Sequence, residues 1–357
     1  MLTAILRWIL PEVDPGGGRR SDEGAARRER ELHELKDKLS RTILSTLMVG
    51  GADTYEVAKR AVDLTTSLAV NEVQVEVSSY PAMFPRLAHE NDAMIVLCNH
   101  ASDLDQYVLN FCLGRAWERH EREAARLDDD EAGGTTRQRH SVRAGPPKMR
   151  GVAFTHSHFA DVPVVGGYVR RFLVGLSKGD DEASVAAKIR DKVRLFNPNV
   201  WLLFPEGRIL DRESLATSRE YVRSLGTRAA AARDGRDWTL VLYPRFKAYR
   251  ALVRELGERL KFVVDCTIAY PETASAPLAG RSFSYLDYPS MLTYMLGSPN
   301  CPVPRVHFGL YTVQDGADLL AVGTRDWLLH VWRKKQQRLQ TMRASMAGDP
   351  AVQSTPA

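Results

Sequence analysis

A recurring pattern constrains the fold of this chain most: an apolar run that ends abruptly in a polar loop. Such runs cover residues 93–98, 200–204, 238–243 and 261–270, and helical patterns such as 248–260 lie between them. Each run is short and almost continuously apolar, which is typical of strands buried on both faces of a sheet. Strands that alternate with helices predict an α/β fold with a mostly parallel sheet flanked by helices.

Polar side chains follow three of these runs directly. The carboxyl ends of parallel strands meet at one edge of a sheet, where ligands bind, so we expect these side chains to lie together. A histidine there can act as a base at neutral pH, and a carboxylate five residues later can fix its tautomer. A base beside basic groups favours acyl or phosphoryl transfer on a phosphate-bearing substrate. The side chains are His100, Asp105, Glu206, Arg208, Arg245 and Lys247.

The rest of the chain divides around this core. Residues 1–70 predict a helical extension, and residues 71–325 predict the main domain. Within that domain, 73–77 alternates like a strand, 163–167 predicts a turn between two strands, and a helix is expected from about Asp180. The charge-rich segment 117–149 predicts a solvated, partly disordered insertion. Residues 326–346 predict a basic amphipathic helix that either docks on the core or contacts a membrane, and 347–357 a disordered tail.

Composition narrows the function classes. The net charge of +5 is a mild excess, and the sequence lacks basic runs with interleaved aromatics, so nucleic acid is not an expected partner. Four widely spaced cysteines predict neither a disulfide framework nor a zinc site. No stretch reaches the roughly 20 apolar residues of a membrane span. The apolar residues 1–10 predict either a short interfacial anchor or a packed helix, and no signal peptide.

Three local patterns suggest other chemistry. The sequence GLSKG at 175–179 fits a nucleophile elbow around Ser177, but the oxyanion loop and the downstream acid and histidine of that motif are missing. His156 and His158 could share one strand face, yet no third zinc ligand is evident. The glycines at 16–18 follow no strand and predict a linker. The sequence therefore predicts no metal site.

The ordered motifs resemble the glycerolipid acyltransferases, the 1-acylglycerol-3-phosphate O-acyltransferase family. His100 and Asp105 are similar to its His–four residues–Asp signature, PVVG at 163–166 to its P-x-x-G block, and FPEG at 204–207 to its FPEGTR block. YPRFKAY, VVDCTIAY and the helix TRDWLLHVWRKKQQRL resemble its later blocks. The last of these is similar to the branch that contains lysocardiolipin acyltransferase and related endoplasmic-reticulum enzymes. The resemblance covers about residues 73–340.

This resemblance implies transfer of a fatty acyl group from acyl-CoA, a co-substrate rather than a cofactor, to the hydroxyl of a lysophospholipid such as lysophosphatidic acid. His100 would be the general base and Asp105 its partner, and no acyl-enzyme would form. Substrate binding would fall to Glu206, Gly207, Arg208, Arg245 and Lys247. The expected location is a membrane surface, peripheral on the cytosolic face of the endoplasmic reticulum or another internal membrane.

The departures from the family pattern concern the acceptor. Arg208-Ile209 stand where the family has Thr-Arg, Phe246 and Ala248 replace Thr and Gly, and His156 occupies a frequent lysine position. Either Arg208 binds the acceptor phosphate from one place earlier, or the acceptor differs. Alternatives to the main hypothesis are a CoA-independent transacylase, a degenerate homologue that binds lipid, and, more remotely, a serine hydrolase.

Overall fold

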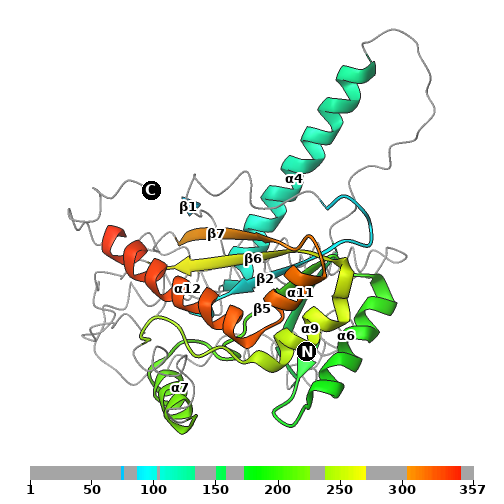
Figure 1. Ribbon diagram of the computed structural model, residues 1–357. Helices are drawn as coiled ribbons and strands as arrows, with labels where there is room; N and C mark the ends of the chain where they lie inside the picture. Colours follow the sequence, from blue (N-terminus) through cyan, green and yellow to red (C-terminus); the bar gives the residue numbers. More distant parts are fainter. Residues whose placement is uncertain are drawn as a thin grey trace, which may run out of the picture.

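A computed structural model describes residues 74–75, 87–102, 105–132, 150–157, 173–225, 238–270 and 304–346. These residues form a seven-stranded sheet with helices on both faces (Figure 1), which confirms the predicted α/β fold. The strands are β1 (Gln74–Val75), β2 (Ala93–Cys98), β3 (Gly151–His156), β4 (Val174–Leu176), β5 (Val200–Leu203), β6 (Leu260–Ala269) and β7 (Arg305–Thr312). The helices are α4 (Asp105–Ala132), α6 (Glu182–Phe196), α7 (Arg212–Ser224), α9 (Phe246–Leu256), α11 (Gly316–Val322) and α12 (Arg325–Met346).

The sheet is parallel except at one edge. Its order is β1-β7-β6-β2-β5-β3-β4, and the five strands from β6 to β4 all run in one direction. β7 pairs with β6 antiparallel, and β1 pairs with β7 in parallel. β2 lies between β5 and β6, so the loops that follow these three strands leave the sheet at the same edge.

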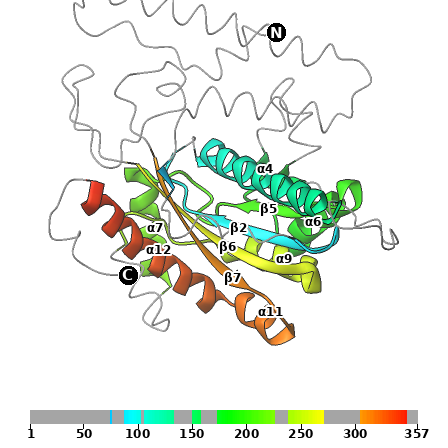
Figure 2. The same cartoon turned by 90° about the horizontal axis from the view of Figure 1, so that it is seen from above.

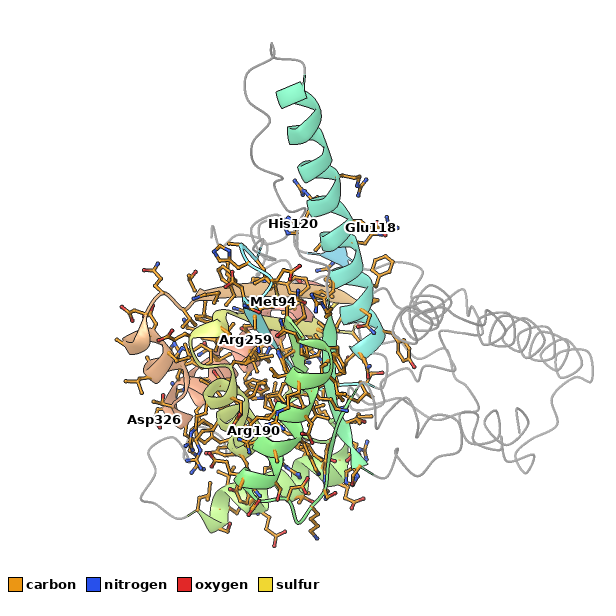
Figure 3. All side chains as sticks on the ribbon, turned by 90° about the vertical axis from the view of Figure 1, so that its right-hand side faces the viewer. Met94, Glu118, His120, Arg190, Arg259 and Asp326 are labelled. Atoms are coloured by element: carbon orange, nitrogen blue, oxygen red, sulfur yellow. The ribbon has the colours of Figure 1, made fainter. Side chains whose placement is uncertain are left out.

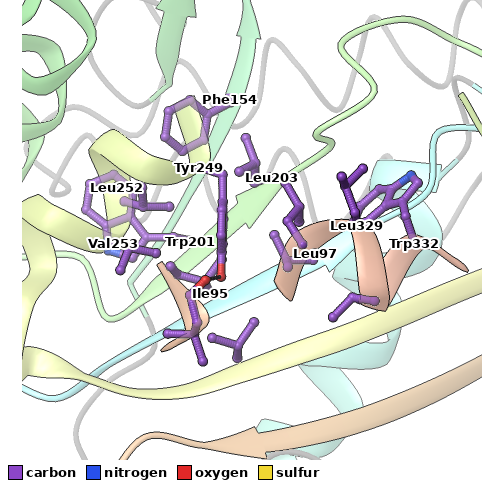
Figure 4. Packing of buried hydrophobic residues seen from close by; sticks show 14 of the residues in the cluster. Ile95, Leu97, Phe154, Trp201, Leu203, Tyr249, Leu252, Val253, Leu329 and Trp332 are labelled. Atoms are coloured by element: carbon purple, nitrogen blue, oxygen red, sulfur yellow. Dashed lines mark hydrogen bonds between the residues drawn. The ribbon is translucent and has the colours of Figure 1, made fainter. Parts of the chain in front are cut away.

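The central position of β2 in the sheet explains why its sequence is apolar throughout. Ala93, Ile95 and Leu97 face a core shared with α6, α9 and α12, and the alternate residues Met94, Val96 and Cys98 face α4. All six are 2% exposed or less. Figure 2 shows α4 on one side of the sheet and α12 on the other. Figure 4 shows Ile95 and Leu97 packed among Trp201, Leu203 and Trp332.

The predicted strand at 238–243 is wrong. This segment contributes to the core, but it does not join the sheet, and it leads into α9. Side chains satisfy its backbone amides in place of a neighbouring strand: Gln336 accepts from the amides of Thr239 and Leu240, and Ser218 accepts from that of Tyr243. The apolar run therefore predicted the burial of this segment correctly, but the segment does not pair with a strand as predicted.

The helix α4 revises the predicted insertion. Its 28 residues make it about 42 Å long, and it continues to Ala132, so residues 117–132 of the predicted insertion are helical. Figure 3 shows the second half of α4 standing clear of the sheet and its covering helices. Residues 133–149 lie outside the described residues, as do the predicted extension 1–70, the turn at 163–167 and the tail 347–357.

The C-terminal helix docks on the core. α12 buries Leu328, Leu329, Val331 and Trp332 against the sheet face that also carries α9. Of the two predicted roles for this helix, the described structure shows docking. Within the described ranges, the helices are all too short or too polar to span a lipid bilayer.

Candidate active site

His100 is held at the carboxyl end of β2 by its neighbours. The side chain of Asn99 accepts a hydrogen bond from the Ile268 amide at 2.9 Å and donates one to the Ile268 carbonyl at 3.0 Å. This pair of bonds ties the end of β2 to β6 beyond the last pair of the ladder. The His100 carbonyl accepts from the Leu210 amide at 2.8 Å, which ties it to the loop after β5. The histidine backbone is thus fixed from both sides.

Asp105, the first residue of α4, orients the His100 ring. Its Oδ2 lies 3.2 Å from His100 Nδ1 and accepts the backbone amides of Ala101 and Ser102 at 2.6 and 2.8 Å. Because Oδ2 accepts from both amides, His100 Nδ1 can contact it only as a donor, and in that tautomer Nε2 is the nitrogen without a proton. The His100 side chain is 23% exposed, and Nε2 has no hydrogen-bond partner among the described residues. The arrangement leaves a neutral Nε2 able to take a proton.

The FPEG turn after β5 packs against this pair. The Phe204 ring lies on the His100 imidazole with their centroids 4.6 Å apart. The Gly207 amide closes the turn on the Phe204 carbonyl, and Gly207 adopts a φ of +67°, a left-handed conformation that glycine tolerates best. The loop then runs through Arg208 and Ile209, both exposed, before α7 begins.

Glu206 lies beneath the turn rather than on its surface. It is 2% exposed, its Oε1 accepts the Trp332 indole N–H at 3.2 Å, and its Oε2 has no hydrogen-bond partner within the described part of the chain. Burial raises the pKa of the Glu206 carboxyl from 4.5 to about 8, although backbone amides of Leu242 and His100 offset part of this effect. Glu206 therefore supports the loop from below, mostly as a neutral acid at pH 7.

Two arginines, Arg208 and Arg245, make one side of the site positively charged. The Arg245 amide donates to the Pro205 carbonyl at 2.7 Å, so the segment before α9 is tied to the FPEG turn although it is no strand. Partial burial and the nearby charge of Arg208 lower the pKa of the Arg245 guanidinium. Neither arginine has an acidic partner in the described ranges. Lys247 instead donates to the Asp180 carbonyl. Two unpaired guanidinium groups side by side favour an anion.

The structure therefore brings most of the predicted residues to one edge. His100, Asp105, Gly207, Arg208 and Arg245 gather there, Glu206 lies below, and Lys247 is turned to the loop before α6. Sequence reasoning missed Tyr270 and Trp332, which contact Asp105 and Glu206 from positions 165 and 126 residues away. The only sign of these two residues in the sequence was that each belongs to a segment that resembles a sequence block of the acyltransferases.

The other patterns gain no support from the described structure. The Ser177 hydroxyl donates to Ser157 Oγ at 2.8 Å, with no histidine in reach among the described residues. His156 is exposed, and His158 lies outside the described residues. In the part of the chain that the structure describes, no three His, Cys, Asp or Glu side chains gather as they would to ligate a metal ion.

The fold and the site define an α/β protein with a histidine–aspartate pair and an arginine-bearing loop on one sheet edge. No protein-family model matches the chain. Over 163 residues the chain is 27% identical to lysocardiolipin acyltransferase 1 of Danio rerio, a match that covers 45% of this chain and 36% of that protein. The chain thus matches about a third of the length of that relative.

A solved structure is also similar. The crystal structure of the 1-acyl-sn-glycerophosphate (LPA) acyltransferase PlsC from Thermotoga maritima matches with a TM-score of 0.42 and 13% identity, over 85% of this chain and 87% of that one. A likeness at that level supports no conclusion on substrate.

Proposed function

We propose that this chain transfers a fatty acyl group from acyl-CoA to the free hydroxyl of a lysophospholipid. The observation that carries the proposal is the His100–Asp105 pair, with a free Nε2, at the sheet edge that also carries two unpaired arginines. The sequence match to a lysocardiolipin acyltransferase supports the same reaction class.

The proposed reaction is a single transfer. His100 Nε2 takes the proton of the acceptor hydroxyl as its oxygen attacks the thioester carbonyl. The carbon–sulfur bond breaks, the CoA thiolate leaves, and the imidazolium returns the proton to it. Asp105 stabilises the imidazolium through Nδ1. General-base assistance of this kind is worth about 10²–10⁴-fold in rate.

The arginines suit the anionic part of a substrate. Arg208 follows Gly207 directly, and the missing side chain of Gly207 lets the Arg245 side chain approach the backbone closely. We propose that Arg208 and Arg245 bind the phosphate of the acceptor or of CoA. Glu206 keeps the loop in place, and Lys247 adds charge from the rim. The substrates are lipids, so the proposed working position is a membrane surface on the cytosolic side of an internal membrane.

The test combines an assay with one pair of variants. Purified chain is incubated with radiolabelled acyl-CoA and vesicles that contain one lysophospholipid each, and label in diacyl lipid is measured. The wild type should label at least one acceptor, and His100→Ala should lose at least 100-fold, as removal of a general base predicts. His330→Ala removes an exposed imidazole on α12 and should keep full activity.

Other outcomes separate the alternatives. Labelling from a diacyl phospholipid donor without CoA would replace the proposal with a transacylase that uses the same pair. Loss of activity in Ser177→Ala but not in His100→Ala would indicate a serine hydrolase. Binding of lysolipid vesicles with no transfer to any acceptor would favour the degenerate lipid-binding homologue, which the altered FPEGRI sequence motivates.

A further inference from the structure

We propose that Tyr270 is a positioning residue that holds the Asp105 carboxylate, and through it the His100 imidazole, in the reactive orientation. The inference rests on the proposed function for its catalytic consequence, but its structural part stands on the geometry alone. Tyr270 follows β6 directly, is 1% exposed, and donates its hydroxyl to Asp105 Oδ1 at 2.7 Å.

The two oxygens of Asp105 have different partners. Oδ2 takes His100 Nδ1 and the amides of Ala101 and Ser102, all of which belong to the same loop. Oδ1 takes Tyr270, which comes from another strand. The loop donors all hold Oδ2, so the partner of Oδ1 has to come from elsewhere in the fold. The Tyr270 hydroxyl, directly after β6, holds Oδ1, so that both oxygens of the carboxylate that contacts His100 are fixed.

A second contact from the same strand supports this role. Ile268, two residues before Tyr270, makes both backbone bonds to the Asn99 side chain. The end of β6 therefore clamps the catalytic loop at Asn99 and at Asp105, on either side of His100.

Chemistry also favours a hydroxyl at this place. Asp105 is 0% exposed, so an Oδ1 without a donor would carry a full desolvation cost there. The tyrosine hydroxyl supplies that donor. Tyr270 itself is too buried to meet a substrate, so its effect must appear in kcat and not in KM.

The experiment uses Tyr270→Phe in the full chain, with Tyr249→Phe as a matched control. Tyr249 is 0% exposed and donates its hydroxyl to the Val322 carbonyl at 2.7 Å, away from the site. Each change removes a buried hydroxyl that donates to an oxygen, Tyr270 in the core on the α4 face of the sheet and Tyr249 in the core on the α12 face. Tyr270→Phe should lower kcat about tenfold with KM for both substrates within twofold, and Tyr249→Phe should leave both constants unchanged.

A second measurement does not depend on turnover. In protein labelled with ¹⁵N at histidine, the His100 ring signals, assigned by their loss in His100→Gln, report which nitrogen carries the proton. Tyr270→Phe should shift them away from the Nδ1-protonated form, and Tyr249→Phe should not. Unchanged ring signals together with unchanged kcat would overturn the inference. Shifted signals in a protein whose wild type transfers no acyl group would keep Tyr270 as the positioning residue and reject the proposed function.

A third variant guards against misfolding. If Tyr270→Phe fails to fold, 3-fluorotyrosine at position 270 keeps the ring and the hydroxyl bond but makes the hydroxyl a stronger donor to Asp105, so the His100 ring signals and kcat should both change. A fluorotyrosine protein with wild-type ring signals and wild-type kcat would contradict the role assigned to the hydroxyl.

Discussion

At the scale of single residues, Gly207 links the backbone of the FPEG turn to the arginine beside it. An added Cβ at this position would lie 3.2 Å from Arg245 Cδ and 3.4 Å from Nε and Nη1. The positive φ of Gly207 and this close approach are two separate reasons for glycine. The positive φ affects the stability of the turn. The close approach determines where the Arg245 guanidinium group can lie, and this position matters for binding.

We predict that Gly207→Ala raises the KM for a phosphate-bearing acceptor by displacing Arg245, and that it also costs about 1–2 kcal/mol in the free energy of unfolding. Gly257→Ala provides the control, because Gly257 has a φ of +51° but no atom within 4 Å of an added Cβ. Steady-state kinetics and urea unfolding measure the two effects. An equal rise of KM in both variants would show that backbone strain, and not Arg245, is responsible.

At the scale of elements, α12 supports the site from beneath the sheet. Trp332 holds Glu206 under the FPEG turn. Nearly one turn further along the helix, Lys335 contacts both β2 and β6. Lys335 is 0% exposed and forms a buried ion pair with Asp265 of β6, and Arg338 binds the second oxygen of Asp265 at 2.8 Å. Its Nζ also donates to the carbonyl of Leu97, shortly before His100.

We expect Lys335→Met to lower the free energy of unfolding by about 3 kcal/mol, since it leaves a buried carboxylate with only Arg338. The double variant Lys335→Met/Asp265→Asn should lose less than the sum of the single changes, because neither charge is then left behind. Arg190→Ala, which breaks the surface pair with Glu255, should cost under about 1 kcal/mol. Strict additivity in the double variant would mean that the pair contributes no coupling.

The same elements show how far the sequence determines the fold. β2, β5 and β6 were predictable because burial on both faces demands unbroken apolar runs, and their shared direction followed from the helices between them. The apolar run at 238–243 misled because burial can be satisfied by side chains such as Gln336. β7 mixes polar and apolar residues and was not predicted. Tyr270 and Trp332 reach the site only through tertiary packing, which local spacing does not encode.

At the scale of the whole molecule, two buried acids respond to pH in opposite directions. Burial alone would raise the pKa of the Asp265 carboxyl, but Lys335 and Arg338 outweigh it and lower that pKa. The stability that Asp265 contributes is therefore present above its ordinary pKa of 3.8 and is lost as the pH falls. Glu206 has a raised pKa, so the stability that it contributes is greatest below 4.5 and is lost as the pH rises through about 8.

These opposite trends predict a stability maximum in mildly acidic solution and a decline above it that Glu206 controls. Between pH 5.5 and 8.5, a pKa of 4.5 in the unfolded chain and about 8 in the folded one reduces the free energy of unfolding by on the order of 3 kcal/mol. Glu206→Gln keeps an acceptor for the Trp332 indole but cannot ionise, so it should remove this decline. Urea unfolding followed by tryptophan fluorescence at both pH values measures it.

Glu255→Gln is the matched control for this pH effect, because Glu255 lies in a partly exposed ion pair with Arg190 and should keep the wild-type decline. The Glu206→Gln and Glu255→Gln proteins each lack one glutamate and share every titratable group except these two, so the difference between them isolates Glu206. A Glu206→Gln protein that declines as steeply as the wild type would show that the carboxyl ionises freely in the fold. In that case Glu206 would carry a charge beside His100 at neutral pH, and the proposed site would hold two carboxylates rather than one.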